Sequence, residues 1–186
     1  MLLNKGGETD RFTYHRASER RMRLEGESRR RVEEAFAPLV GLPISDMWRY
    51  GCQKFEIGEQ KSRVDDDGDE FTCADWGLVV SGSWRIEGPD GFVLSSDHFG
   101  PDRERHDEHG EPFYRLLETA PPTVLSIVVE DDGGLFLPLS EGFSLRVSPN
   151  EEEAGEFEEW RLMPPDDDPR GHLVLEGDEV EWSGCG

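Results

Sequence analysis

One short stretch of this chain gathers side chains of the types that bind metal ions or transfer protons. Imidazole nitrogens and carboxylate oxygens are common zinc ligands, but zinc sites combine them at defined spacings. Here no third ligand has an enforced spacing. The three histidines are therefore weak metal candidates, and a metal-dependent enzyme that uses the loop from His98 to His109 stays open as an alternative function. The stretch contains His98, His106 and His109 with Asp97, Asp107 and Glu108.

An acidic run, Asp65-Asp66-Asp67-Gly68-Asp69-Glu70, has the composition of a calcium-binding loop. An EF-hand requires oxygen ligands at positions 1, 3 and 5, glycine at position 6 and glutamate at position 12. With Gly68 at position 6, Arg63 falls at position 1 and Ala74 at position 12, so the motif fails. The run is predicted to be a charged turn that faces solvent.

Signatures of covalent catalysis and of nucleotide cofactors are missing from the sequence. It contains no Gly-x-Ser-x-Gly, no phosphate-binding loop and no Gly-x-Gly-x-x-Gly. Cys52, Cys73 and Cys185 have no neighbouring histidine pattern that would indicate a nucleophile. Carboxylates are so numerous that no pair stands out as a general acid and base. We therefore predict no catalytic residue and no cofactor.

The same three cysteines bear on the cellular compartment. Their odd number and the absence of a Cys-x-x-Cys pair argue against a disulfide framework and favour a reducing environment. The first residues contain no apolar stretch that resembles a signal core. No run approaches the roughly 20 apolar residues of a membrane span. We expect a cytoplasmic protein that does not contact a membrane.

Charge is distributed very unevenly along the chain. Residues 1–31 carry nine Lys and Arg against five Asp and Glu, a net of +4, whereas residues 32–186 carry a net of −26. A compact domain with this much negative charge repels itself, so the acidity lowers stability. The acidity can keep the protein soluble, attract a basic partner or reflect adaptation to the environment, and the sequence leaves these explanations open.

The basic end has the features of a flexible arm. Residues 1–27 show no periodic apolar face, so we expect the folded domain to span residues 28–186. The arginines of this region could contact nucleic acid weakly, but an arm that folds back on the acidic domain is favoured. They are Arg20, Arg21, Arg23, Arg29, Arg30 and Arg31.

Apolar spacing predicts a mainly antiparallel β domain of the α+β class, built as two packed sheets or an open barrel. An N-terminal helix is expected from Ser28, its N-cap, to Val40. A long polar stretch, 97–113, and a short inserted helix, 112–119, divide the strands into two groups. Short turns that contain glycine make neighbouring strands antiparallel. The expected strands are 44–50, 53–57, 71–80, 84–87, 92–95, 124–130, 135–139, 143–147, 157–163, 173–176 and 179–182.

Two parts of the sequence echo each other. Trp84-Arg85-Ile86, a turn and Phe92-Val93-Leu94 resemble Trp160-Arg161-Leu162, a turn and Leu173-Val174-Leu175. An internal duplication would produce this echo, but coincidence between short β-hairpins is the interpretation that we favour. Trp84 and Trp160 are both predicted to be largely buried in the core.

A set of mostly apolar and aromatic motifs is spread over residues 41–182: Gly41-Leu42-Pro43-Ile44, Gln53–Gly58, Trp76–Val80, Ser83–Ile86, Ser95-Ser96-Asp97, Gly142–Pro149, Glu159–Leu162 and His172-Leu173-Val174. Together they resemble an uncharacterised bacterial domain family of actinobacterial type. The resemblance implies a β-rich core, and no functional residues are carried over from it. Small acidic domains of this kind are also similar in style to immunity proteins of bacterial toxin systems.

These observations favour a non-enzymatic, acidic interaction protein of the immunity or antitoxin type, which neutralises a basic protein partner such as a toxin or nuclease. Dense carboxylates would steer a basic protein toward the surface and speed the encounter. A few buried aromatic contacts would then supply lasting affinity. The expected contact residues lie in two acidic loops and are Asp65, Asp66, Asp67, Asp69 and Glu70, and Glu151, Glu152 and Glu153 within the segment Glu151–Glu159.

Overall fold

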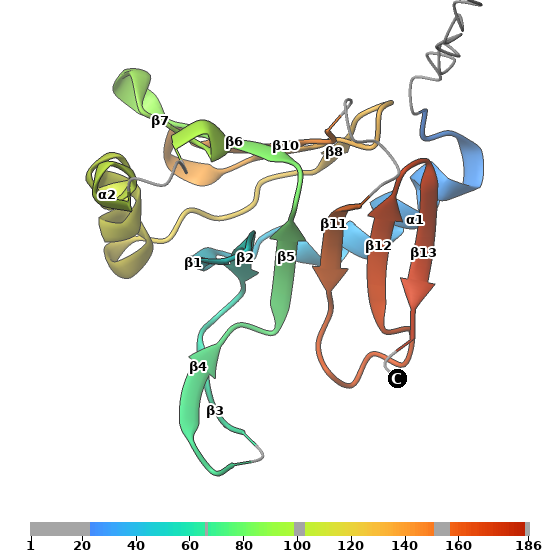
Figure 1. The fold of residues 1–186 in the computed structure, drawn as a ribbon, viewed down its shortest axis with the longest axis horizontal. Helices are drawn as coiled ribbons and strands as arrows, with labels where there is room; N and C mark the ends of the chain where they lie inside the picture. The colour runs from blue at the N-terminus through green and yellow to red at the C-terminus, as the bar shows by residue number, and fades with distance from the viewer. Residues whose placement is uncertain (1–22, 66, 99–102, 151–156, 185–186) are drawn as a thin grey trace, which may run out of the picture.

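The computed structural model describes residues 23–65, 67–98, 103–150 and 157–184. Over these residues the chain forms a six-stranded and a five-stranded antiparallel sheet that pack face to face, and a separate two-stranded hairpin (Figure 1). No sheet in this part of the chain closes into a barrel. The predicted α+β class with mainly antiparallel strands is therefore confirmed in its two-sheet form.

The six-stranded sheet has the strand order β1-β2-β5-β11-β12-β13. Its inward side chains, among them Phe55, Leu78 and Leu162, are fully buried against the other sheet. The strands are β1 Ile44–Tyr50, β2 Cys52–Ile57, β5 Trp76–Val80, β11 Glu158–Met163, β12 His172–Glu176 and β13 Glu179–Ser183.

The five-stranded sheet has the order β7-β6-β10-β9-β8. Two of its turns contain a residue in the left-handed region, Asp90 at φ 58° and Glu141 at φ 57°. The strands are β6 Ser83–Glu87, β7 Val93–Ser95, β8 Val128–Val129, β9 Leu135–Pro138 and β10 Ser144–Ser148. The short 3-10 helices are η1 Ala37–Leu39, η2 Pro89–Gly91, η3 Ser96–His98 and η4 Ser140–Gly142.

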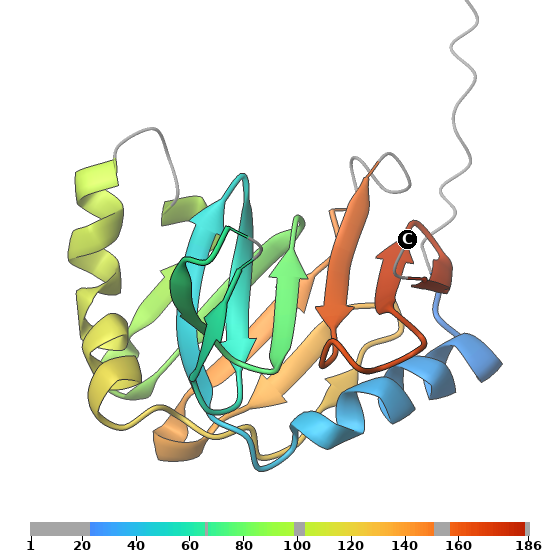
Figure 2. The ribbon, with the colours of Figure 1, turned by 90° about the horizontal axis from the view of Figure 1, so that it is seen from below.

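Two α-helices cover the open sides of the sandwich, as Figure 2 shows from below. Helix α1, Gly26–Phe36, contacts the edge strands β8 and β13. Helix α2, Arg103–Thr119, contacts the opposite edges, β1 and β7. Both edges of both sheets are therefore covered by a helix, which protects their unpaired backbone groups from other strands.

Helix α2 is longer than the sequence predicted. The stretch 97–113 was expected to be a polar loop, yet the helix begins at Arg103 and passes through Pro112. It is anchored by Phe113, whose ring lies 6.2 Å from that of Phe92 and 5.7 Å from that of Phe143. Packing of the helix face that carries Phe113 outweighs the loss of the backbone hydrogen bond that Pro112 cannot donate. The polar composition of residues 97–113 gave no indication of this packing.

The folded domain also begins earlier than the predicted boundary at residue 28. Helix α1 starts at Gly26 rather than at a Ser28 cap, and a 3-10 turn replaces its expected last turn. Leu24 is buried in the core, and its N–H donates to the Asp131 carbonyl at 2.6 Å. An isolated leucine shows no periodicity, so the sequence pattern missed it. Residues 1–22 of the predicted arm lie outside the described residues.

Three strand predictions needed correction. The predicted strand 71–80 is two strands, β4 Glu70–Cys73 and β5, which belong to different sheets. Strand β3, Lys61–Val64, was not predicted, because its residues are polar and largely exposed. The predicted strand 124–130 is paired only at Val128–Val129 and through an isolated bridge from Val124 to Leu139.

The two halves of the chain pass through the two sheets in the same order of elements. In the first half, α1 is followed by a three-stranded meander, β1-β2-β5, and the chain then crosses to the other sheet for β6 and β7. In the second half, α2 is followed by the meander β8-β9-β10, and the chain crosses back for β11 and β12. Each sheet therefore combines a meander of one half with the crossing strands of the other.

The sequence echo falls at corresponding positions of this pattern. Trp84 on β6 pairs with Val147, and Trp160 on β11 pairs with Val80. The two tryptophans are 4% and 0% exposed, as predicted. Each packs edge-on against a phenylalanine, with ring centroids 5.5 Å apart for Trp84 and 5.3 Å for Trp160. The likeness therefore extends over both halves of the fold, which favours the internal duplication that the sequence left as the alternative to coincidence.

Candidate interaction site

The hairpin β3–β4 is the main difference between the halves. In the second half, β9 and β10 are joined by residues 139–143, whereas the corresponding strands β2 and β5 are joined by residues 58–75. Lys61–Val64 and Glu70–Cys73 pair with each other and extend away from the body (Figure 1). Among the described residues of 59–73, none belongs to the buried core. The hairpin is an addition to a fold whose core does not use it.

A buried carboxylate ties the hairpin to the six-stranded sheet. Glu56 is 4% exposed, and its Oε2 accepts hydrogen bonds from Gln60 Nε2 at 2.7 Å and from the Ala74 N–H at 3.0 Å. These two residues flank the hairpin on either side. Oε1 accepts from Trp48 Nε1 at 3.2 Å and Lys54 Nζ at 3.1 Å. The Glu56 side chain therefore binds the residues at both ends of the hairpin, and donors from β1 and β2 hold it in place.

The charge of Glu56 is retained by these donors. Burial alone would raise the pKa of the Glu56 carboxyl, but the hydrogen bonds from Gln60, Trp48, Lys54 and Ala74 together hold it below its ordinary value. The side chain is thus an ionised acceptor at neutral pH. Hydrogen bonds to an ionised acceptor are about twice as strong as neutral ones, which suits a structural clamp.

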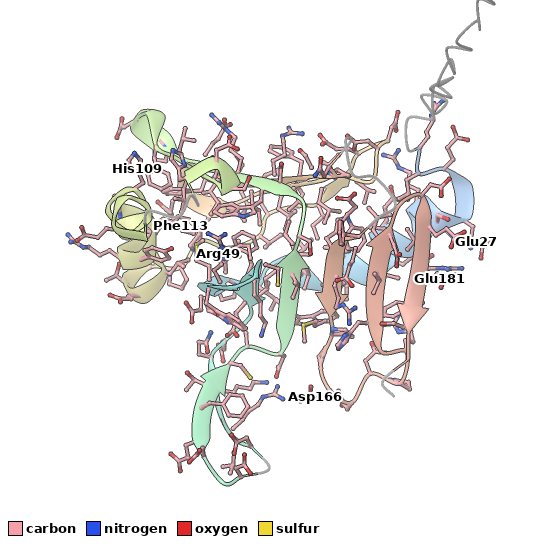
Figure 3. All side chains as sticks on the ribbon, viewed as in Figure 1. Glu27, Arg49, His109, Phe113, Asp166 and Glu181 are labelled. Carbon is pink, nitrogen blue, oxygen red and sulfur yellow. The ribbon has the colours of Figure 1, made fainter. Side chains whose placement is uncertain are left out.

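Ion pairs fix the direction in which the hairpin points. Arg63 on β3 pairs with Asp75 at 3.1 Å and with Asp166 in the β11–β12 loop. Figure 3 labels Asp166 where this loop approaches the hairpin. Lys61 also pairs with Asp75, and the hydrogen bond from Lys61 lowers the pKa of the Asp75 carboxyl. The cations of the hairpin are therefore engaged at its base.

The tip of the hairpin carries carboxylates of two kinds. Asp65 Oδ1 accepts from the N–H groups of Asp67 and Asp69 at 3.0 and 2.8 Å, so this side chain holds the turn. Asp67, Asp69 and Glu70 are exposed, and no ion pair joins any of them to a described residue. Of the five contact residues predicted here, Asp65 holds the turn together, and three residues present exposed carboxylates. The fifth, Asp66, lies outside the described residues.

Two apolar side chains lie beside these carboxylates. Val64 and Phe71 are 62% and 45% exposed at the end of the hairpin, next to the acidic turn. Sequence reasoning missed both, because it placed Phe71 in a strand that continued to Val80 and gave Val64 no role. Val64 pairs with Glu70 and Arg63 with Phe71, and paired residues share a face, so Val64 and Phe71 lie on opposite faces of the hairpin. Aromatic residues are enriched in the cores of interfaces, and Phe71 is the exposed aromatic near this turn.

The second predicted acidic surface is only partly visible. Glu151, Glu152 and Glu153 lie outside the described residues. Of the rest of that segment, Glu158 pairs with Arg161 at 2.6 Å. Glu159 is buried, and its Oε2 accepts from the Asn150 N–H at 2.8 Å. The prediction that the whole segment to Glu159 forms a contact surface is wrong at its C-terminal end.

The histidine cluster is brought together only in part. The rings of His98 and His109 stack with centroids 4.9 Å apart, and His98 Nδ1 accepts from the Ser95 N–H at 3.0 Å. Among the described side chains, no three His, Cys, Asp or Glu residues gather as a metal site requires. The side chain of His106 lies outside that set, so a metal-dependent activity stays a prediction.

The described arginines of the basic region are used within the fold. Arg29 donates to Asp131 at 2.7 Å and to the Val129 carbonyl at 2.5 Å, and Arg31 donates to the Val180 carbonyl at 2.9 Å. These bonds join α1 to the strands on either side of it. Arg23 and Arg30 pair with neighbouring glutamates, whereas Arg20 and Arg21 lie outside the described residues.

Comparisons with known proteins add no relative to this description. No protein-family model matches the chain, and neither the curated proteins nor the solved structures contain a match. The resemblance to an uncharacterised bacterial family stays a prediction. Within the described ranges, no helix has the length and apolar character needed to cross a membrane.

Proposed function

We propose that this protein is a non-enzymatic, acidic interaction protein, and that it binds a basic protein partner through the β3–β4 hairpin. A toxin or nuclease that the protein neutralises is the kind of partner that fits this role. The observation that carries the proposal is that a hairpin outside the core presents three exposed carboxylates that form no ion pair with the described residues, near one exposed apolar side chain on each face of the hairpin.

The charge distribution supports a basic partner. The chain has a formal net charge of −22, which creates a field that attracts cations over its surface. At the hairpin, Arg63 and Lys61 are neutralised by Asp75 and Asp166, so the tip stays negative. Exposed charges of this kind accelerate association more than they strengthen the complex.

The exposed apolar residues of the hairpin would supply buried contact area, which exposed charges alone do not. A partner that packs on the Phe71 face of the hairpin would remove this ring from water, and buried aromatic residues dominate the affinity of many interfaces. Val64 lies on the opposite face and would be covered by a partner that wraps around the tip. The clamp at Glu56 and the ion pairs of Arg63 hold these side chains in place before binding. Preorganisation of this kind lowers the entropy cost of association.

A matched pair of charge-reversal variants tests the proposal. The hairpin variant carries Asp67→Lys, Asp69→Lys and Glu70→Lys, and leaves the structural Asp65 unchanged. The control variant has the same net charge and carries Glu118→Lys, Glu176→Lys and Asp178→Lys, three exposed acids distant from the hairpin in sequence. Wild type and both variants are immobilised, and proteins captured from the source cells are identified and then purified.

The proposal predicts a basic protein that wild type and control variant capture and the hairpin variant does not. With that protein purified, the association rate should fall steeply with salt while the dissociation rate changes much less. If the three proteins capture the same set, the acidity acts only on solubility or as environmental adaptation, and the proposal is wrong. If both variants lose capture equally, binding depends on net charge and not on the hairpin, and the proposal is wrong as well.

A further inference from the structure

The outer face of the five-stranded sheet carries apolar side chains where a sheet face in contact with water usually carries polar ones. On β9, Leu135 and Leu137 are fully buried between the two sheets. Because side chains alternate along a strand, Phe136 and Pro138 point to the opposite, outer face, where both are partly exposed. Strand β9 is therefore apolar on both of its faces.

Two exposed apolar residues extend this surface toward the edge of the sheet. Val128 on β8 pairs with Phe136 and is 46% exposed. Leu125 is 56% exposed, and its N–H donates to the Pro138 carbonyl at 2.9 Å. The residues Leu125, Val128, Phe136 and Pro138 are therefore neighbours, and we refer to them as the apolar patch.

The charged residues next to the apolar patch cancel one another. Arg146 on β10 pairs with Phe136 on one side and with Arg85 of β6 on the other, so both arginines lie on the outer face. Arg146 forms an ion pair with Glu130, and Arg85 forms one with Glu87 at 2.7 Å. These four residues sum to zero, so the formal net charge of −22 comes from the rest of the chain.

The two α-helices leave this face open. Helix α1 contacts β8 and helix α2 contacts β7, which are the two edge strands of the sheet. Figure 1 shows the sheet edge-on, with the six-stranded sheet on one side and no labelled helix or strand on the other. The apolar patch and its neutral surroundings are therefore accessible to a second molecule.

We propose that this outer face is the interface of a symmetric homodimer, in which the apolar patches of two copies pack on each other. Over most of its surface a chain with this net charge is repelled by its own copy, and a neutral face removes that obstacle. A two-fold axis places the same patch on both sides of the contact, so Arg146 of each copy can approach Glu130 of the other. A basic partner would gain no attraction from a neutral face, which separates this surface from the acidic hairpin.

The size of the face sets the expected strength of the dimer. Five strands about 4.8 Å apart, each about five residues long, give a projected area of roughly 400 Å² per copy. Interfaces below about 1,200 Å² in total are typical of weak complexes. We therefore expect a monomer–dimer equilibrium that depends on protein concentration, and not an obligate dimer.

Sedimentation equilibrium of the full chain at micromolar to millimolar concentrations measures this association directly. The dimer should become stronger as salt is added, because salt screens the repulsion between two acidic copies. Binding of a basic protein to the hairpin should respond to salt in the opposite direction. The sign of the salt effect therefore distinguishes the two surfaces, and the dimer does not depend on the proposed function.

The matched variants are Val128→Glu and Val64→Glu, because each replaces an exposed strand valine and adds the same charge. Val128→Glu should weaken the dimer about ten-fold or more, since it places a carboxylate in the centre of the contact. Val64→Glu lies on the hairpin and should change the dimer by less than about two-fold. Leu125→Glu serves the same purpose if circular dichroism shows that Val128→Glu disturbs the fold.

A chain that stays monomeric at every concentration would overturn the proposal and would leave the outer face to a different protein. Equal weakening by Val128→Glu and Val64→Glu would mean that the association depends on net charge and not on the apolar patch. A dimer that dissociates as salt is added would be held together by exposed ion pairs elsewhere, and the proposal would again be wrong.

Discussion

The two halves of the molecule follow the same path through space, yet their corresponding strands β2 and β9 differ sharply in chemistry. The positions on β2 that are polar, Gln53, Lys54 and Glu56, correspond on β9 to Leu135, Phe136 and Pro138. The strand β9 serves its sheet and is followed by a turn of five residues, 139–143. The strand β2 also holds an inserted hairpin through Glu56 and carries the buried amide of Gln53.

This difference shows that corresponding strands of a repeated fold can carry different polar groups. The inward residue at the centre of the strand stays apolar in both halves, as Phe55 and Leu137, whereas the neighbouring inward position is Gln53 in one half and Leu135 in the other. The polar substitutions fall at the two ends of β2, where the sheet gives way to a turn. Core packing and attachment of the hairpin thereby depend on different side chains of a single strand.

The largest effect is expected from removing the two buried tryptophans that the halves share at corresponding positions. Trp84→Ala and Trp160→Ala should each lower the free energy of unfolding by about 3–5 kcal/mol, because both rings fill corresponding core positions. The loss of Trp160 includes the hydrogen bond that its Nε1 donates to the Gly133 carbonyl at 2.9 Å. Urea denaturation measures both values.

The control for these substitutions is Trp48→Ala, because Trp48 is largely exposed. It should cost about 1 kcal/mol, chiefly through the lost hydrogen bond to Glu56. An effect of Trp84→Ala no larger than that of this control would show that the two tryptophans do not play equivalent roles.

A smaller effect concerns the clamp that exists in the first half alone. Glu56→Gln keeps the size of the side chain but leaves Lys54 without its counter-charge, so unfolding should become easier by about 2 kcal/mol. Hydrogen exchange of the Ala74 backbone N–H should accelerate more than exchange in the centre of β5, because the base of the hairpin opens before the sheet does.

Glu59→Gln is the matched control for this clamp, since Glu59 is exposed and lies two residues before β3. It should change stability by no more than about 0.5 kcal/mol. Equal effects of the two substitutions would argue that Glu56 acts through net charge and not through its four hydrogen bonds.

The smallest effect is electrostatic and concerns the longer loop of the second half, residues 164–171. Hydrogen bonds from Arg170, first from its side chain and then from its backbone N–H, lower the pKa of Asp168 from 3.8 to about 2. A lowered pKa means that the pair stabilises the fold above the unfolded value and that this contribution is lost as the pH falls toward 2.

Arg170→Met should therefore return the pKa of Asp168 toward its ordinary range, as measured by ¹³C NMR of the carboxyl group. Arg115→Met removes a distant cation on α2 and should leave that pKa unchanged. Titration of Asp168 near pH 4 in the wild type would contradict the role given to Arg170.

Sequence patterns predicted those parts of the fold in which the burial of each residue follows from its own side chain and its near neighbours in the sequence. Strand β6 alternates exposed and buried residues along its length, and period-two alternation is the signal of a half-buried strand. The burial of Trp84 and Trp160 followed from the same reasoning. The pattern fails where structure depends on partners far away in the sequence, as it does for Leu24 and for the first turns of α2.

The candidate site shows the same limit. The acidic turn from Asp65 to Glu70 could be recognised from composition. The role of Glu56 could not, because its burial depends on donors from Trp48, Gln60 and Ala74, which lie in separate elements. The break of the predicted strand 71–80 has the same cause, since Ala74 turns toward Glu56 and leaves the ladder.

The central claim is that the first half has the fold of the second half with the β3–β4 hairpin added, and a graft tests it most directly. Residues 57–76 are replaced by the sequence of residues 139–143, because the pair Glu56 and Gly77 corresponds to the pair Pro138 and Ser144 that this turn already joins. Urea denaturation of the graft should show a single cooperative transition with a loss of only about 2 kcal/mol, the value of the few hydrogen bonds removed. A graft that unfolds without cooperativity would show that the hairpin belongs to the core and would contradict the account.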